Sequence, residues 1–278
     1  MLATNKFMIQ SQICFACGGE IFIVGTKTRL VKCAACGLGK TLDEIRQNYN
    51  SYHRDTVYFD SEKQFKNIFQ KRVRLIGKFR KPGTALEIGS SSGLMLSLLK
   101  NSGWEVAGIE PSKEACKVSR KRGITTLNKS FENSKFNKET FDLVIMNHVL
   151  EHMENPNDIL ERINGILKKD GMLLVDVPNF ESLSAKIWGS NWKYILPQEH
   201  KWHFTLKSLS YLLTGTGLKI IYAETHSGVW EYASPAKELF ESLTGGKKRF
   251  FGEAISAIPN LIVSKLGMGT GLTVLAKK

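Results

Sequence analysis

Four of the five cysteines form a pattern that can bind a metal ion. Cys14 and Cys17 make one C-x-x-C pair, Cys33 and Cys36 make a second, and fifteen residues separate the two pairs. This spacing is typical of zinc sites in which two tight turns face one ion. Because four thiolates fill a tetrahedral site, we expect a structural zinc ribbon and no catalytic zinc. The alternative is a pair of ordinary turns with reduced cysteines and no metal.

A glycine-rich turn, EIGSSSG, can hold a second ligand. Its candidate binding residues are Glu87, Gly89, Ser91 and Gly93, and the turn follows an apolar stretch and opens a helical one. A P-loop would carry Gly-Lys-Ser or Gly-Lys-Thr after the glycines, and this turn does not. A dinucleotide site would have a third glycine where Leu96 stands. The turn therefore favours a ligand without a chain of phosphates.

Two acids indicate which ligand suits the turn. Glu110 follows Gly89 by twenty-one residues, where an acid at the end of the second strand accepts both hydroxyls of a ribose. Glu87 would repel a pyrophosphate but would tolerate a cationic sulfonium and an amino acid tail. These charges predict S-adenosylmethionine, which combines adenosine, a sulfonium and methionine, as the cofactor.

Histidines supply the candidates for a general base. A methyl transfer to a hydroxyl or amine needs a group that removes the proton, and histidine is the default near neutral pH. His200 is our first candidate, His203 follows closely, and His148 is the third. The stretch HVLEH at 148–152 also matches the H-x-x-E-H pattern of some zinc proteases, although no third ligand motif accompanies it.

An aromatic stretch surrounds two of these histidines. Residues 188–205, WGSNWKYILPQEHKWHFT, combine three tryptophans and a tyrosine with Glu199, His200 and His203. We expect a lid over 180–205, where aromatic faces stack on sugar rings and His or Glu accepts a hydroxyl proton. Packing of the lid against the core explains the tryptophans equally well, and both interpretations stay open.

The elements that must position these residues alternate along the chain. Periodicity predicts buried strands and intervening helices, the strands over 84–88, 104–110, 124–128, 141–147 and 171–178 and the helices over 94–103, 112–123 and 155–171. This order predicts an α/β fold with a doubly wound, Rossmann-like sheet. Further strands are expected over 217–228 and 271–278. Between them, 229–269 is expected to form a helical insertion that covers the site, or an interfacial helix with weak membrane-surface association.

Together these motifs resemble the class I S-adenosylmethionine-dependent methyltransferases over roughly residues 60–225 and the final strand. The matching stretches are EIGSSSG, GIEPS, FDLVIMNHVLEHM and DGMLLVDVPN. The resemblance implies a seven-stranded sheet and a role for each matching position. Glu110 would hold the ribose, Pro111 and Ser112 would flank the adenine, and Asn147 and His148 would lie beside the methionine moiety.

This sequence departs from the family pattern at two positions. Ser91 replaces the middle glycine of the turn, and no Asp follows the third strand, where only Phe131 and Glu132 lie near the expected adenine edge. Some methyltransferases bind a divalent ion where Glu151 and His152 stand, and capping of a helix start is the alternative. The chain is also similar to bacterial methyltransferases with an amino-terminal zinc ribbon that modify sugars or cell-surface glycans.

Charge and composition bound the remaining alternatives. The chain has 39 Lys and Arg against 26 Asp and Glu, a net charge of +13, which favours an anionic partner. The helix expected over 62–81 is basic on one face, so an RNA methyltransferase is the alternative enzyme. A cofactor-binding and zinc-binding protein without turnover is the alternative from another class. No secretory signal or spanning stretch is apparent, so we expect a cytoplasmic protein.

We expect three parts: a zinc ribbon over 1–45, a connector with the basic helix over 46–83, and the methyltransferase domain over 84–278. The expected activity is methylation of a small-molecule or glycan acceptor, at oxygen or, as the alternative, at carbon.

Overall fold

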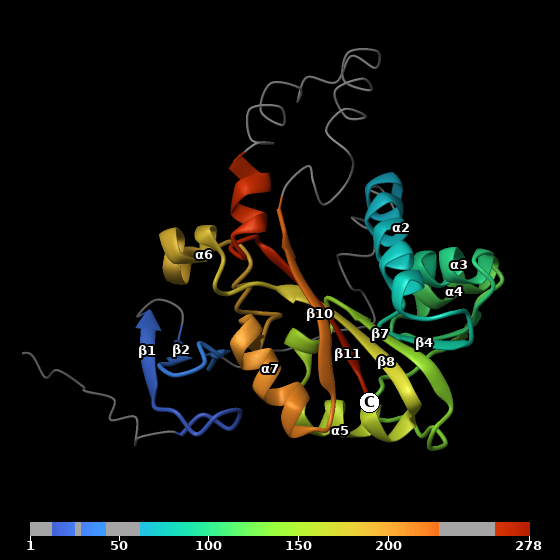
Figure 1. The fold of residues 1–278 in the computed structure, drawn as a ribbon, viewed down its shortest axis with the longest axis horizontal. Helices are drawn as coiled ribbons and strands as arrows, with labels where there is room; N and C mark the ends of the chain where they lie inside the picture. The colour runs from blue at the N-terminus through green and yellow to red at the C-terminus, as the bar shows by residue number, and fades with distance from the viewer. Residues whose placement is uncertain (1–12, 26–28, 43–61, 228–258) are drawn as a thin grey trace, which may run out of the picture.

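The computed structural model describes residues 13–25, 29–42, 62–227 and 259–278, which form two sheets with flanking helices (Figure 1). The connector expected before residue 62 and most of the expected insertion, up to residue 258, lie outside the described residues. Within the part of the chain that is described, no helix is both long and apolar enough to cross a membrane.

The larger sheet has seven strands, whose bounds are β4 (Thr84–Ile88), β5 (Glu105–Ile109), β6 (Thr125–Leu127), β7 (Phe141–Asn147), β8 (Leu167–Pro178), β10 (Lys219–His226) and β11 (Gly271–Lys277). Their order is β10-β11-β8-β7-β4-β5-β6. The five strands from β6 to β8 are parallel, and β11 runs antiparallel to both of its neighbours. The expected α/β, Rossmann-like fold is confirmed. The direction of winding reverses between β4 and β7, and ligands of such sheets bind at the carboxyl ends of the strands there.

Helices cover both faces of this sheet, as a doubly wound fold requires. The helical elements of the described residues are α2 (Glu62–Phe79), α3 (Leu94–Asn101), α4 (Lys113–Lys121), the 3-10 turn η2 (Leu150–His152), α5 (Pro156–Ile166), α6 (Leu183–Trp188), the 3-10 turn η3 (Gly189–Asn191), α7 (Leu206–Gly215) and a helix over 259–265. Of these, α6 and η3 pack beside the ribbon strands. Alternate residues of β7 serve the two faces. Leu143 and Ile145 pack with α2 and α3, whereas Val144 and Met146 pack with α5 and α7.

The smaller sheet joins the ribbon to the expected lid. Its antiparallel order is β1 (Ile21–Gly25), β2 (Leu30–Cys33), β3 (Gly39–Thr41) and β9 (Trp202–His203). The last strand belongs to the segment expected to form the lid. Trp192 packs in a core cluster with Leu30 of the ribbon, while Trp188 is 63% exposed. Packing therefore accounts for one of these two tryptophans, and only Trp188 offers its ring to solvent.

One expected helix is too long. The helix predicted over 155–171 ends at Ile166, and β8 begins at Leu167, which pairs with Phe141 of β7. Asp170 has a φ of 63°, a left-handed conformation that a helix does not accommodate. The register of β7 and β8 shifts at this point, so residues 168–171 form a bulge in the sheet.

Candidate active site and metal centre

The glycine-rich turn joins β4 to α3 with three residues in the left-handed region. Gly89, Ser91 and Gly93 have φ angles of 69°, 44° and 72°. A Cβ atom on Gly89 would lie 2.5 Å from Val149 Cγ2, and one on Gly93 would lie 2.4 Å from Ser119 Oγ, so both positions need glycine for space as well as conformation. Ser91 adopts the conformation that the missing middle glycine would take.

Glu110 ties this turn to the end of the neighbouring strand β5. Its carboxylate accepts hydrogen bonds from the backbone N–H of Ser91 at 2.9 Å and of Ser112 at 2.8 Å. Ser112 in turn caps α4 by accepting from the N–H of Ala115. The structure thus brings the ribose acid expected from the sequence beside the turn.

Two further residues border this edge. Asn128, which the sequence analysis missed, donates from Nδ2 to the carbonyl oxygens of Glu110 and Pro111 at 3.0 and 2.9 Å. Its signal is a polar residue directly after a short strand. Phe131 is buried, stacks on Phe136 and lies under the guanidinium of Arg162. The adenine-edge role of Phe131 stays a prediction.

Glu87 and Asn147 form a buried polar pair between β4 and β7. Asn147 Nδ2 donates to Glu87 Oε1 at 2.9 Å, while Glu87 Oε2 and Asn147 Oδ1 are buried without a hydrogen-bond partner among the described residues. Burial raises the pKa of Glu87 to about 8, against the opposing effects of the Asn147 hydrogen bond and the Arg72 charge. Unpaired buried polar atoms are costly, so this pair fits a polar, cationic ligand that completes its hydrogen bonds.

His148 lies directly beyond this pair and between two buried carboxylates. Its Nδ1 is 3.3 Å from Glu151 Oε1 and its Nε2 is 3.3 Å from Asp176 Oδ1, while 31% of the side chain is exposed. Its φ of 52° is left-handed, which is uncommon for a residue with a side chain. Burial alone would lower the pKa of His148, but the Glu151 hydrogen bond and the Asp176 charge outweigh it and raise the pKa.

Asp176 is the residue that sequence reasoning missed most clearly. It is fully buried on β8, where Oδ2 pairs with Arg72 of α2 at 2.5 Å, with His226 Nε2 at 3.2 Å and with the hydroxyl of Thr273. Burial would raise the pKa of Asp176, but the Arg72 guanidinium and the neighbouring histidines hold it well below its usual range. The signal was available: a lone acid in the apolar run LLVDVP must have a partner.

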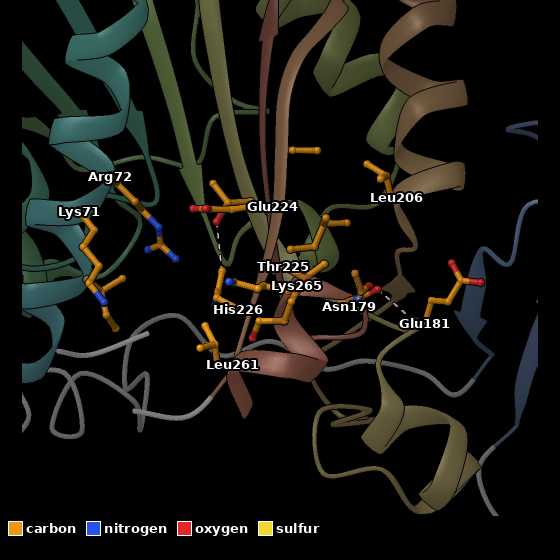
Figure 2. A pocket seen from close by; sticks show the side chains of 16 residues that line it. Lys71, Arg72, Asn179, Glu181, Leu206, Glu224, Thr225, His226, Leu261 and Lys265 are labelled. Atoms are coloured by element: carbon orange, nitrogen blue, oxygen red, sulfur yellow. Dashed lines mark hydrogen bonds between the residues drawn. The ribbon is translucent and has the colours of Figure 1, made fainter. Parts of the chain in front are cut away.

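A cavity of about 490 Å³ adjoins this acid at the carboxyl ends of β8 and β10. Arg72, His226 and Thr273, the partners of Asp176 Oδ2, all line it. Figure 2 shows Lys71 and Arg72 extending from α2 on one side and Asn179 and Glu181 lying on the other. The helix over 259–265 adds further lining residues, among them Leu261, Ser264 and Lys265.

His200 and His203 are each only 2% exposed. His203 Nε2 lies 2.9 Å from Thr41 Oγ1 of the ribbon, and His200 Nδ1 lies 2.8 Å from the carbonyl oxygen of Tyr194. Burial lowers the pKa of each to about 3. Their role as the base stays a prediction. Among the three candidate bases, His148 has the most exposed side chain.

Glu151, His152 and His200 also lie together. Their possible ligand atoms are within 4.8 Å of one another, so the divalent-ion site that the sequence suggested at Glu151 and His152 has a geometric basis. Donors on one zinc ion at about 2.1 Å lie about 3.4 Å apart, which makes this group looser than a formed site. Glu151 instead pairs with His148, and its pKa falls to about 2 because the histidine contacts outweigh burial.

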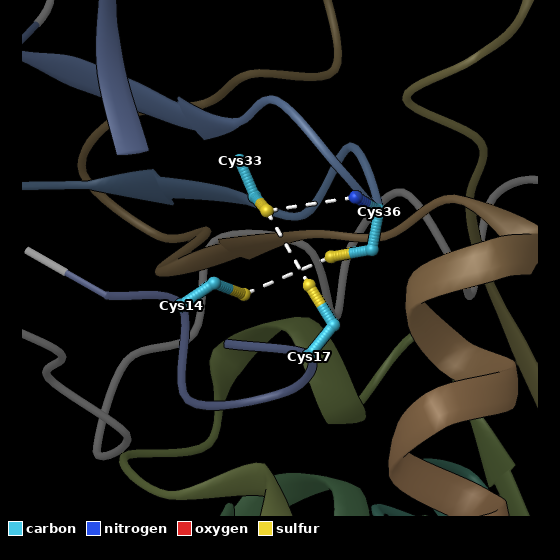
Figure 3. Close-up of side chains that lie close together, drawn as sticks. All are labelled: Cys14, Cys17, Cys33 and Cys36. Atoms are coloured by element: carbon cyan, nitrogen blue, oxygen red, sulfur yellow. Dashed lines mark hydrogen bonds between the residues drawn. The ribbon is translucent and has the colours of Figure 1, made fainter. Parts of the chain in front are cut away.

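The four cysteines of the ribbon converge (Figure 3). Cys14 Sγ lies 3.7 Å from Cys36 Sγ, and Cys17 Sγ lies 3.5 Å from Cys33 Sγ. Thiolates bound to one zinc ion at about 2.3 Å in a tetrahedron lie about 3.8 Å apart. The donor set and its spacing are therefore compatible with zinc.

Comparison with known proteins now settles the family. The family described as "Methyltransferase domain" matches residues 59–223, more than half of the chain. The chain belongs to this methyltransferase family. A protein of Thermotoga maritima described as a SAM-dependent methyltransferase, possible histamine N-methyltransferase, has the same fold, with a TM-score of 0.58 at 19% identity over 81% of this chain and 97% of that one.

Two curated relatives match over shorter stretches. An uncharacterized protein of Methanocaldococcus jannaschii is 28% identical over 44% of this methyltransferase and 57% of its own length. The C-methyltransferase NovU of Streptomyces niveus is 27% identical over 54% of this chain and 37% of its own length. The chain thus spans about half or less of the length of these relatives.

Proposed function

We propose that this methyltransferase transfers a methyl group from S-adenosylmethionine to a hydroxyl of a small-molecule or glycan acceptor held in the cavity beside Asp176. The observation that carries the proposal is that both carboxylate oxygens of Asp176 make contacts, each on a different side. One carboxylate oxygen contacts three residues that line the cavity, and the other faces His148. Asp176 therefore joins His148, which directly follows Asn147, to three residues that line the cavity.

The cofactor residues are those of the turn and its surroundings. Glu110 would hold the ribose, Ser112 and Pro111 would border the adenine, and the Glu87–Asn147 pair would receive the cationic amino acid end. When bound, S-adenosylmethionine supplies a methyl carbon activated by a positively charged sulfur. The orphaned oxygens of Glu87 and Asn147 support this assignment, because a cationic ligand would pair with both.

His148, in its neutral form, would accept the proton that the acceptor hydroxyl loses, at the ring nitrogen that carries no proton. Glu151 and Asp176 would stabilise the imidazolium that results, because both are ionised and lie 3.3 Å from its two nitrogens. Both carboxylates are buried, so they also hold the ring in one orientation. His200 and His203 would then support the lid and take no proton from the acceptor.

The acceptor class rests on the cavity lining. Thr225 and Ser264 bring hydroxyl oxygens to the lining, which can accept hydrogen bonds. Lys265 suits an anionic group, whereas Glu181 and Glu224 of the same lining would repel one placed beside them. A glycan or sugar derivative with a phosphate or carboxylate combines these features. Methyl transfer to carbon is the second candidate, because NovU is named a C-methyltransferase and the same base would remove a proton from carbon.

Labelled S-adenosylmethionine tests the proposal. Purified protein is incubated with nucleotide sugars, bacterial glycans and RNA, and the products are analysed by mass spectrometry. Label on a sugar hydroxyl or carbon supports the proposal, and label on RNA alone would support the RNA alternative. Binding of S-adenosylhomocysteine without transfer to any acceptor would favour a non-catalytic binding protein. Glu110→Ala is the control that should lose both binding and transfer.

A further inference from the structure

A single residue, Lys201, links the ribbon to the acid that holds His148. Its backbone N–H donates to the carbonyl oxygen of Glu151 at 2.9 Å, and its own carbonyl oxygen accepts from the N–H of Thr41 at 2.9 Å. Thr41 is the last residue of the ribbon strand β3, and Glu151 follows His148 by three positions. One residue and two hydrogen bonds therefore join the ribbon to the backbone of Glu151, the acid that contacts His148.

The ribbon side of this link is extensive. Gly39 and Lys40 of β3 pair with His203 and Trp202 of β9, and Thr41 Oγ1 lies 2.9 Å from His203 Nε2. Further along the chain, the Thr205 hydroxyl donates to the carbonyl oxygen of Cys36 at 2.7 Å. This bond reaches the backbone of a cysteine in the four-thiol cluster. The segment directly after β9 is thus hydrogen-bonded to the turn that carries Cys36.

On the other side of the link, residues 199–202 are hydrogen-bonded to the segment that contains Glu151. The Trp202 indole N–H donates to the carbonyl oxygen of Met153 at 2.9 Å, and His152 Nδ1 lies 3.0 Å from the carbonyl oxygen of Glu199. Residues 199–202 therefore run along 151–153 and cover Glu151, whose side chain is 1% exposed. Removal of this cover would admit water to Glu151 and weaken its contact with His148.

We infer that the ribbon, through Lys201 and strand β9, positions Glu151 and His148, so that metal occupancy of the four cysteines determines whether the methyl-transfer site is formed. The inference rests on the proposed role of His148. It makes Lys201, His203 and Thr41 positioning residues that act through Glu151.

Metal binding can control whether the ribbon positions Glu151 and His148, because the ribbon strands are short. The three ribbon strands contain five, four and three residues, too few to form a stable sheet alone. In small zinc modules the free energy of metal binding is folding free energy. Loss of the metal would therefore loosen β3 first, and then β9, which pairs with no other strand within the described part of the chain.

Hydrogen exchange measured by mass spectrometry on the full chain, before and after removal of the metal with a chelator, tests the inference. We expect exchange in the peptides 148–154 and 199–205 to increase by about tenfold or more, because local opening follows loss of the metal. Exchange in β5, whose strand partners are β4 and β6, should stay unchanged. Elemental analysis confirms the metal content of each sample, and S-adenosylhomocysteine binding shows that the main domain remains folded.

The ring titration of His148 by NMR gives a readout that a merely structural role would not move. In the metal-free protein we expect its pKa to fall toward the ordinary value of 6.5, because the Glu151 contact is weakened. Thr41→Val, which keeps the metal and the backbone pairing, should increase exchange at 199–205 by about fivefold, the effect of one lost hydrogen bond. Thr125→Val, on the exposed start of β6, is the matched control.

The inference is overturned if the protein binds no metal at the four cysteines. It is also overturned if chelation leaves both exchange and the His148 titration unchanged. Failure of the proposed function would look different, because the metal-loaded protein would then bind no S-adenosylhomocysteine or transfer no methyl group.

Discussion

Nε2 of His148 lies 3.3 Å from Oδ1 of Asp176, and the two residues come from the ends of neighbouring parallel strands. The backbone enforces this proximity, because the N–H of His148 donates to the carbonyl oxygen of Asp176 at 2.8 Å. A left-handed φ at His148 turns the chain away from the sheet while its ring stays beside the acid. Such strain at a functional position persists only where the surroundings hold it.

Replacement of His148 should separate catalysis from cofactor binding. His148→Asn keeps a residue type that tolerates positive φ but removes the basic imidazole. We expect kcat to fall by about 10²-fold to 10⁴-fold, the usual contribution of a general base. Affinity for S-adenosylhomocysteine, measured by calorimetry, should stay within about twofold. Full activity in this variant would exclude His148 as the base and return His200 to consideration.

The pH dependence of the rate follows from the charges around His148. Its folded pKa is raised, and only the neutral ring can accept a proton, so kcat should rise with pH through a value above 6.5. The free energy of unfolding should change in the opposite direction. Because the pKa of His148 is higher in the folded protein than in the unfolded chain, its protonation stabilises the fold below pH 6.5, and this stabilisation is lost as pH rises through the folded pKa. Glu151→Gln removes one stabilising carboxylate and should move the rising limb to lower pH. An unmoved limb would show that another group titrates.

Removal of the Asp176 charge should destabilise the fold. In Asp176→Asn the buried Arg72 guanidinium loses its counter-charge, which typically costs about 3–5 kcal/mol in the free energy of unfolding. Urea denaturation measures the change. Asp170→Asn, at an exposed acid paired with Lys277, is the matched control and should leave stability nearly unchanged, because exposed ion pairs contribute little. Equal effects of the two substitutions would contradict the role of Asp176 as the buried anchor.

The sequence was sufficient for elements whose signal is local. The strand expected over 141–147 has the bounds of β7, because an apolar run bounded by polar residues needs no distant information. The helix expected over 155–171 was too long, because basic residues followed by Gly171 match the usual sequence signal for the end of a helix. The pairing of Leu167 with Phe141, a tertiary contact, determines the true end.

Local sequence signals are confined to the turn after β4 and the acid after β5, whose roles in cofactor binding stay predictions. Glu87, Gly89 and Gly93 lie in β4 and the turn after it, and Glu110 follows the next strand, so their spacing carries the signal. Asp176 and Thr273 are 97 residues apart in the sequence, so no local pattern could predict their hydrogen bond. Strand β9 has two residues, too short for any periodicity, and forms only because the ribbon provides a partner.

Cofactor binding should release a proton at neutral pH. Burial raises the pKa of Glu87 to about 8, so this carboxyl group is mostly protonated at pH 7 in the free protein. A cationic ligand beside it would favour the ionised form and release the proton. Calorimetry of S-adenosylmethionine binding in buffers of different ionisation enthalpy should therefore show net release at pH 7 and less at pH 9. Glu87→Gln should abolish the release, and a release that survives this substitution would have another source.

Filling the cavity should affect the acceptor and spare the cofactor. Ser264 lines the cavity from the helix over 259–265, and Ser264→Phe would place an aromatic ring where the acceptor is proposed to bind. We expect kcat/KM for the acceptor to fall on the order of tenfold or more, as for other steric changes in a binding pocket. S-adenosylhomocysteine affinity should not change, because the turn and Glu110 contribute no residue to the cavity lining. Ser102→Phe, at an exposed position after α3, controls for the added bulk. Unchanged kinetics with a known acceptor would move the acceptor site away from this cavity and toward the lid.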